Sequence, residues 1–334
     1  MQRRVHQEVE QVKERSGWPA SRTLAALGIA RRSYYRWLKE EAWAKERPAE
    51  APRPVPLYEA LTEEQQAVLA YARKHPTLRH RELAWRMVDE DVAYLSPSTV
   101  YRILKRADLV CPWRRRARRI RPAIERASRP DQRWSTDLMQ VQVGDRVYPM
   151  VAFLDEYSRF IVHHEVLLSM DGLSVSAAAQ RAIETLPKGA DGKRASPEVR
   201  SDNGSCYISK EFRVVLTENG LGHHRIRPHC PEENGLMERA NRTLREGLEG
   251  EDEPRDLLEA SSAMGRIVRR YNEARLHSAL GYLPPSEYYR GDPAARFEDR
   301  RRKLSRARHH RRERNLGLRQ GTLPLEGGEA VAPG

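Results

Sequence analysis

The chain has 334 residues, and its 60 Lys and Arg against 47 Asp and Glu give a formal net charge of +13. A hydrophobic fraction of 39% is enough for at least one buried core, so the composition excludes a wholly disordered chain, and the length suits two or three domains. Three cysteines without a CxxC pair exclude a disulfide framework and a four-cysteine zinc site. No apolar run approaches the roughly 18 residues of a membrane span, so we expect a cytoplasmic protein without a membrane partner.

The positive charge is concentrated at the two ends of the chain. Residues 1–130 carry 28 basic and 16 acidic side chains, residues 131–250 carry 15 and 18, and residues 251–334 carry 17 and 13. This distribution favours ends that bind a polyanion and a middle that uses carboxylates for chemistry. Two dense clusters stand out, one at Arg114, Arg115, Arg116, Arg118, Arg119 and Arg121 and one from Arg300 to Arg314. Either could be a solvated linker or tail, but phosphate binding is the better interpretation because both border the acidic middle.

Residues 1–45 are typical of a helix-turn-helix unit. Ser21 is the expected cap of a first helix, Gly28 breaks the pattern, and a second helix follows over about 30–39. Arg31, Arg32 and Arg36 lie on the polar positions of that second helix, where they could contact DNA in the major groove. Residues 46–60 then form a proline-rich linker.

Residues 61–110 repeat this organisation in kind. Thr62 is the expected cap of one helix, a second runs over about 80–89, and Ser96 with Pro97 begins a third, which exposes Ser98 and Arg102. Both units could be small helical bundles with a wet basic face. Two of them in tandem before an arginine-rich linker, 111–129, favour DNA binding.

From residue 130 the pattern changes to strands alternating with helices. We expect strands over 133–143, 146–158, 159–168, 198–201 and 224–226, with helices over 173–186, 210–218 and 231–248. This order predicts an α/β catalytic domain over 130–250, with a mixed sheet flanked by helices. A helical extension over 251–292 and a basic tail over 293–334, disordered at its end, complete the predicted domains.

Three carboxylates occupy positions suited to chemistry with hard divalent cations. Asp137 lies in the first strand, Asp202 follows the short strand at 198–201, and Glu238 lies in the long helix, with 35 residues between the last two. Each has an ordinary alternative: a partnered strand acid, an Asx turn in the sequence DNG, and an exposed helix glutamate. Spacing alone does not decide between these interpretations.

The surrounding motifs are more specific than the spacing. They are STD at 135–137, SDNG at 201–204, NG-x-x-ER-x-NRTL at 234–244 and YNEARLHSALGYLPPSEYY at 271–289. Over roughly residues 15–290 the chain resembles DDE transposases and retroviral-type integrases, most closely bacterial insertion-sequence transposases with an integrase-like core. The resemblance implies a ribonuclease-H-like core with a mixed five-stranded sheet, preceded by two all-α helix-turn-helix units. It also implies that Asp137, Asp202 and Glu238 are the catalytic, metal-binding acids, and that the protein is a homo-oligomer on double-stranded DNA in the bacterial nucleoid.

The implied activity is cleavage and joining of DNA strands at the ends of a mobile element. Two Mg²⁺ ions, with Mn²⁺ as a substitute, would activate the attacking oxygen and stabilise the leaving oxygen. Arg242 and Arg245 lie on the face of the long helix that carries Glu238, where they could hold phosphates, although a solvated basic stripe is the alternative. Two rival functions remain open, a catalytically inactive repressor of the element and a ribonuclease-H-like nuclease that cuts without joining. Unlike retroviral integrases, the chain cannot supply an N-terminal zinc module, so no structural zinc is expected.

Overall fold

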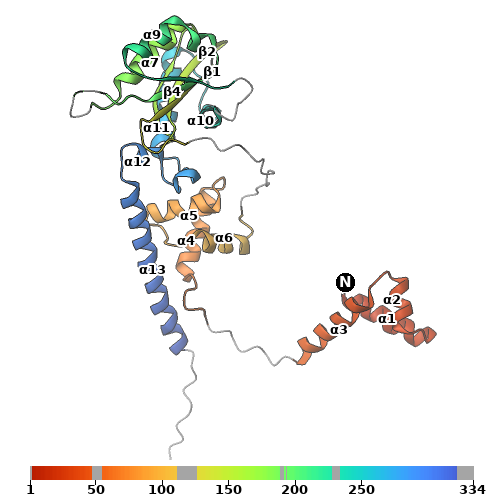
Figure 1. Ribbon diagram of the computed structural model, residues 1–334. Helices are drawn as coiled ribbons and strands as arrows, with labels where there is room; N and C mark the ends of the chain where they lie inside the picture. Colours follow the sequence, from red (N-terminus) through yellow and green to blue (C-terminus); the bar gives the residue numbers. More distant parts are fainter. Residues whose placement is uncertain are drawn as a thin grey trace, which may run out of the picture. The chain divides into compact units, whose positions relative to one another are not determined.

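The computed structural model describes residues 2–46, 55–110, 126–188, 192, 194–227 and 234–321. These form two compact units, one from residues 1–59 with 313–334 and one from residues 60–312. Figure 1 shows the helices and strands of both units along the chain. Within the described ranges, no helix is both long and apolar enough to cross a membrane.

The N-terminal part of the first unit consists of three helices, α1 (Gln2–Ser16), α2 (Ala20–Ala26) and α3 (Arg31–Glu46). Val9, Leu24 and Tyr34, one from each helix, form its small core. Gly28 adopts a positive φ of 64°, which allows the sharp turn between α2 and α3. The expected cap at Ser21 is wrong, because α2 begins at Ala20 directly after the extended Pro19. Arg31, Arg32 and Arg36 lie on the exposed side of α3.

The second unit begins with α4 (Thr62–Lys74), α5 (His80–Asp89) and α6 (Pro97–Arg106). Apolar residues of the three helices, including Val68, Leu83 and Val100, pack into one core. Ser96 caps α6, since its Oγ accepts a hydrogen bond of 3.3 Å from the backbone N–H of Thr99. Thr62, by contrast, is the first residue of α4 and not its cap.

The part of the second unit that follows residue 130 is built on a five-stranded sheet with the order β3-β2-β1-β4-β5. The strands are β1 (Arg133–Val143), β2 (Arg146–Asp155), β3 (Ile161–Val166), β4 (Glu198–Ser201) and β5 (His223–Arg225). β1, β2 and β3 form an antiparallel meander, while β4 pairs parallel to β1 and β5 pairs parallel to β4. This mixed sheet confirms the predicted ribonuclease-H-like core.

Helices cover both faces of the sheet (Figure 1). Trp134 and Phe153 face a core closed by α7 (Gly172–Glu184), α8 (Ser205–Ile208) and α9 (Lys210–Glu218). Met139 and Met150 face a second core closed by α10 (Gly235–Leu248) and α11 (Leu257–Glu273). Because side chains alternate along a strand, Asp137 lies on the same face as Met139, toward α10, and Leu138 lies on the other face.

The chain continues through a short helix, η2 (Ser278–Leu280), into α12 (Pro285–Tyr289) and α13 (Pro293–Gly321). The residues predicted as a basic tail are therefore a 29-residue helix up to Gly321. The expected disorder at the end of the tail falls on residues 322–334, outside the described residues.

Part of the basic cluster on α13 is internal, so its predicted phosphate binding is wrong for those residues. Arg300 is only 3% exposed and forms a bidentate ion pair with Asp89 of α5 at 2.8 and 2.6 Å. Arg311 is also buried and contacts Glu64 of α4 at 2.7 Å. Counting charges along the sequence missed these acids, because they lie more than 200 positions away.

Candidate active site

Asp137 lies in the centre of the sheet, where β1 passes under α10. Its Oδ1 accepts a hydrogen bond of 3.0 Å from the backbone N–H of Leu138, and its Oδ2 accepts one of 3.0 Å from Nδ2 of Asn241. The side chain is half-buried. One donor from β1 and one from α10 therefore fix the orientation of the Asp137 carboxylate.

Asp202 directly follows the C-terminal end of β4, the neighbour of β1. Its Oδ1 accepts a hydrogen bond of 2.9 Å from the backbone N–H of Gly204, so the Asx turn considered as the ordinary alternative does form. A Cβ at Gly204 would lie 3.0 Å from this same Oδ1, so a larger residue there would crowd the carboxylate. The turn thus holds one carboxylate oxygen, and none of the described residues donates to the other.

Glu238 lies in the first turn of α10 and is exposed. A negative charge is favourable at this position, because the backbone N–H groups in the first turn of a helix carry a partial positive charge. Glu238 and the hydrogen-bond donor to Asp137, Asn241, are three positions apart and so share one face of the helix. The helix therefore presents an acid and an amide toward the strand that carries Asp137.

The three acids influence one another electrostatically. Burial raises the pKa of Asp137 to about 6, and the negative charges of Asp202 and, more weakly, Glu238 act in the same direction. The hydrogen bonds from Leu138 and Asn241 oppose this rise. Asp202 and Glu238 thus lie near enough to Asp137 for their charges to raise its pKa, and the two hydrogen bonds offset this rise only in part.

Such a site suits a divalent cation of the magnesium type, which prefers carboxylate oxygens. Within the described ranges, no group of three His, Cys, Asp or Glu side chains is already arranged to hold a metal ion. The donor set nevertheless fits, because a bound cation would offset the repulsion that raises the pKa of Asp137. The residues that could hold the ion are Asp137, Asp202 and Glu238.

Asn241 was missed by the sequence analysis, although it lies inside one of the motifs that were singled out. It is buried, its Nδ2 donates to Asp137, and its Oδ1 has no hydrogen-bond partner among the described residues. Its spacing of three from Glu238 on one helix could have identified it. Its amide is thus bonded to the carboxylate of Asp137 through Nδ2.

Replacing Asn241 with alanine should raise the pKa of Asp137 further above 6, because a hydrogen bond that stabilises the charged form is lost. Affinity for Mg²⁺ should fall by roughly 10- to 100-fold, as for other residues that orient a metal ligand. NMR titration of the Asp137 carboxyl carbon and calorimetric titration with Mg²⁺ measure the two effects. Thr243→Ala, on the same helix but bonded to Arg239, is the control. An unchanged pKa in the Asn241 variant would contradict this role.

A buried ionic network supports the two strands that carry the aspartates. Glu156 accepts a hydrogen bond of 2.6 Å from Oγ of Ser135 on β1 and lies 3.1 Å from Nη1 of Arg200 on β4. Glu156 and Arg200 are both buried. Because breaking a buried ion pair is costly, this network holds β1 and β4 in a defined relation.

The other predicted site residues are spread along the chain. Ser98 and Arg102 are exposed on α6, and Arg242 and Arg245 are exposed on α10. The predicted DNA contacts Arg114, Arg115, Arg116, Arg118 and Arg119 lie outside the described residues. His223, part of a histidine-rich segment, bonds to Oγ of Ser201 at 2.9 Å, and burial lowers its pKa.

Comparison with protein families finds the same core. Residues 127–231 and residues 219–285 each match a family model described as "Integrase core domain". The two matches together span the sheet, the three acids and α11.

Individual relatives agree with the family models. An uncharacterized 39.2 kDa protein of insertion element IS476 from Xanthomonas euvesicatoria is 26% identical over 244 residues, covering 71% of this chain and 67% of the relative. The putative transposase InsD for insertion element IS2E from Escherichia coli is 29% identical over 211 residues, covering 59% of this chain and 92% of the relative. A similar solved structure is the HTLV-2 integrase catalytic core domain in complex with magnesium, with 18% identity and a TM-score of 0.39, covering 49% of this chain and 99% of that one.

Proposed function

Because this chain carries an integrase core domain and is homologous to insertion-element transposases, we propose that it is a DNA transposase. In this function it binds the ends of a mobile element and, with Mg²⁺, cleaves and joins DNA strands. The observation that carries the proposal is the match of residues 127–231 to an integrase core domain, in which Asp137 of β1 is hydrogen-bonded to Asn241 of α10. Carboxylates near the exposed Arg242 and Arg245 of α10 are suited to a metal-assisted reaction on a polyanion.

Asp137, Asp202 and Glu238 would hold two Mg²⁺ ions, which Mn²⁺ could replace. When bound, these ions supply Lewis-acid stabilisation of the charge on the attacking and leaving oxygens of a phosphodiester. Asn241 and the backbone N–H of Gly204 keep the two aspartates oriented. Hydrogen bonds of this kind orient metal ligands, so removing either of them would weaken cation binding.

The basic surfaces would bind the DNA. Arg242 and Arg245 on α10 lie beyond Glu238 by one and two helical turns, so phosphates next to the reacting bond could reach them. We propose residues 1–45 and 61–110 as the units that read the element ends, through Arg31, Arg32 and Arg36 and through Ser98 and Arg102. Handling two DNA ends would require a homo-oligomer, at least a dimer.

Incubation of the purified chain with Mg²⁺ and a duplex copied from the inverted repeats that flank its gene tests the proposal. Joined products are expected. Cleavage without joining would identify a nuclease instead, and a shift in electrophoretic mobility without any cutting would identify a repressor. Asp202→Asn is the matched control, because it should bind the duplex about as well as the natural chain and yield no product.

The joining rate should fall as the pH is lowered through about 6. Asp137, with its raised pKa of about 6, is ionised above this pH and protonated below it, and a protonated carboxyl is a poor ligand for Mg²⁺. A higher Mg²⁺ concentration should move the midpoint to lower pH, because the cation competes with the proton. Rates over pH 5–8 at two Mg²⁺ concentrations measure this. A midpoint that does not respond to Mg²⁺ would assign the titration to another group.

A further inference from the structure

Three segments that are distant in the sequence pack together beside the first turn of α10. Ile161 of β3, Met237 of α10 and Tyr271 of α11 belong to one hydrophobic core. Asn272 ties the end of α11 to the start of β3, because its Oδ1 accepts a hydrogen bond of 2.9 Å from the backbone N–H of Ile161 and its Nδ2 donates one of 3.0 Å to the backbone oxygen of the same residue. The residues that flank these positions are therefore close together in the folded chain.

Each of these segments carries an arginine, and the three together are called the arginine cluster. Arg159 lies just before β3, Arg239 lies near the start of α10, and Arg275 lies just after α11. Burial first, and then the charges of these arginines, lower the pKa of His277 to about 4. The same three charges oppose the effect of burial on Tyr271, whose pKa burial raises to about 12. The cluster is thus close enough to act on one histidine and one tyrosine.

The arginine cluster contains more positive than negative charge. The Glu156 carboxylate opposes the lowering of the pKa of Arg159 by burial, but it already pairs with Arg200 at 3.1 Å. Arg239 and Arg275 are exposed, and the side chain of neither forms an ion pair or a hydrogen bond with a described residue. Like charges that are held together repel, so an anion bound among them would stabilise the arrangement.

His277 supplies an unused hydrogen-bonding atom beside these charges. Its ring lies edge-on to Tyr271, with the ring centres 5.0 Å apart, and its Nε2 is buried without a hydrogen-bond partner among the described residues. The backbone of His277 is fixed, since its N–H donates to the oxygen of Leu283 at 3.1 Å and its own oxygen accepts from the N–H of Leu280 at 2.9 Å. Because a buried polar atom without a partner is costly, this nitrogen marks a place for a ligand.

We propose that the arginine cluster and the Nε2–H of His277 bind one phosphate of the DNA backbone. Guanidinium groups and a neutral imidazole both donate hydrogen bonds to phosphate oxygens, and the phosphate supplies the negative charge that the cluster lacks. Arg239 directly follows Glu238 in α10, so a strand held at the acids would pass next to this site. The inference rests on the proposed function and adds to it a further point at which the strand is held.

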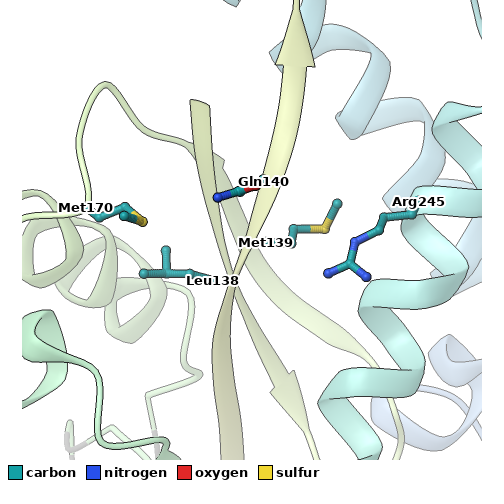
Figure 2. Close-up of a pocket in the computed structure, with 5 residues that line it drawn as sticks. All are labelled: Leu138, Met139, Gln140, Met170 and Arg245. Atoms are coloured by element: carbon teal, nitrogen blue, oxygen red, sulfur yellow. The ribbon is translucent and has the colours of Figure 1, made fainter. Parts of the chain in front are cut away.

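The site differs from the phosphate contact proposed for Arg245. Figure 2 shows Arg245 directed toward β1, where it lines a pocket with Leu138, Met139, Gln140 and Met170. Arg239 lies six positions earlier on α10, about one and two-thirds turns, so its side chain leaves a different face of the helix. Variants of the two arginines should therefore affect contacts with different phosphates.

Replacing single phosphates by neutral methylphosphonates tests this site. The probe is the inverted-repeat duplex with one methylphosphonate, moved along each strand in turn, mixed with the Asp202→Asn chain so that no strand is cut. At one position the neutral group should weaken binding about 10-fold, the value of one charge-assisted hydrogen bond. Adding Arg239→Gln with Arg275→Gln to that chain should weaken binding of the unmodified duplex by a similar factor and reduce the salt slope by about 1. In this cluster variant the same methylphosphonate should have no further effect, because the contact is already lost.

The chain offers a control that removes the same charge, Arg255→Gln with Arg269→Gln. Both residues are exposed, Arg255 before α11 and Arg269 on the face of α11 opposite Tyr271. In this variant the critical methylphosphonate should still weaken binding about 10-fold. Arg245→Gln should be coupled to a methylphosphonate at a different position.

The His277 imidazole gives a readout that does not depend on affinity. Because a bound phosphate offsets the positive charges, the pKa of His277 should rise from about 4 toward its ordinary 6.5 when the duplex is added, as followed by NMR of isotope-labelled histidine. Inorganic phosphate is the second probe. A rise with inorganic phosphate but not with the duplex would assign the site to a free anion and overturn the inference.

Two further results would overturn it: no phosphate position coupled to Arg239 and Arg275, or a pKa of His277 that the duplex leaves unchanged. If the natural chain still joined the duplex, the transposase proposal would stand in both cases. A natural chain that neither binds nor joins the duplex would overturn both proposals together.

Discussion

Replacing Asp137 with asparagine should abolish strand joining and at the same time make the metal-free protein more stable. Activity should fall on the order of 10³-fold or more, because in the proposed function Asp137 is one of three residues that act as a unit. Stability should rise because the natural carboxylate is charged at neutral pH in a site that disfavours its charge, through burial first and the neighbouring acids second. Thermal unfolding without divalent cations should show a Tm higher by roughly 5 °C at pH 7.5.

The sign of this effect can be checked by changing the pH. The pKa of Asp137 is raised from 3.8 to about 6, so the folded state binds the proton more tightly than the unfolded chain does. The stability linked to this proton is fully present below about pH 3.8 and is lost as the pH rises through 6. The advantage of the Asp137→Asn variant should therefore be largest above pH 6 and disappear toward pH 4.

A second asparagine substitution provides the control for stability. Asp145 lies exposed in the turn between β1 and β2, so Asp145→Asn should leave both the Tm and the joining rate unchanged. If Asp137→Asn lowered the Tm at neutral pH, the hydrogen bonds from Asn241 and Leu138 would outweigh the burial of charge. The assignment of Asp137 as an electrostatically strained ligand would then be wrong.

The second large effect is expected far from the acids, at Arg300. Its guanidinium pairs with Asp89, donates to the backbone oxygens of Gly281 and Tyr282 at 3.1 and 2.6 Å, and lies 4.9 Å from the ring centre of Trp85. Arg300→Ala would leave a carboxylate and two carbonyl groups without their donor. Breaking a buried pair of this kind costs about 3–5 kcal/mol, so the Tm should fall by roughly 10 °C.

Arg301, the next residue of α13, is the matched control. Its side chain is 74% exposed and, among the residues that the structure describes, pairs with Glu298 on the same helix, so Arg301→Ala should change stability by less than about 1 kcal/mol. Calorimetry of both variants measures the difference. Equal Tm values for the two variants would show that the buried pair contributes no more than a surface one. Arg300→Met with Asp89→Leu should recover much of the loss, because an apolar pair replaces both charges at once.

The sequence predicted the elements of the core well because their signals are local. The bounds of β1, β4 and α9 match the expected ranges of 133–143, 198–201 and 210–218, since alternation, strand-end turns and helical periodicity are all contained within the segments themselves. The placement of Asp137 in β1 and of Asp202 directly after β4 was predicted by the same local patterns, whereas the pairing of β1 with β4 was not. The helix that carries Glu238 was also expected, although residues 231–233 of its predicted range lie outside the described residues.

Contacts between distant segments could not be predicted in this way. Asn241 meets Asp137 across 104 positions and Arg300 meets Asp89 across 211, and no local pattern encodes either partner. The charge count along α13 therefore predicted an exposed basic surface, whereas Arg300 and Arg311 form internal ion pairs. The caps predicted at Ser21 and Thr62 were wrong for another reason. The extended residues Pro19 and Leu61 precede these helices, and at α4 the Glu64 side chain accepts the hydrogen bond from the backbone N–H of Leu61.

The pair between Asp89 and Arg300 also affects the order in which the protein can assemble during synthesis. Asp89 leaves the ribosome 211 residues before its partner, which at about 5–20 residues per second is an interval of roughly 10–40 s. Throughout that interval the apolar residues of α5 can already pack, but the Arg300 guanidinium that neutralises the side chain of Asp89 is not yet present. The bundle of α4 to α6 can thus collapse early, yet it reaches its final stability only when α13 has been translated.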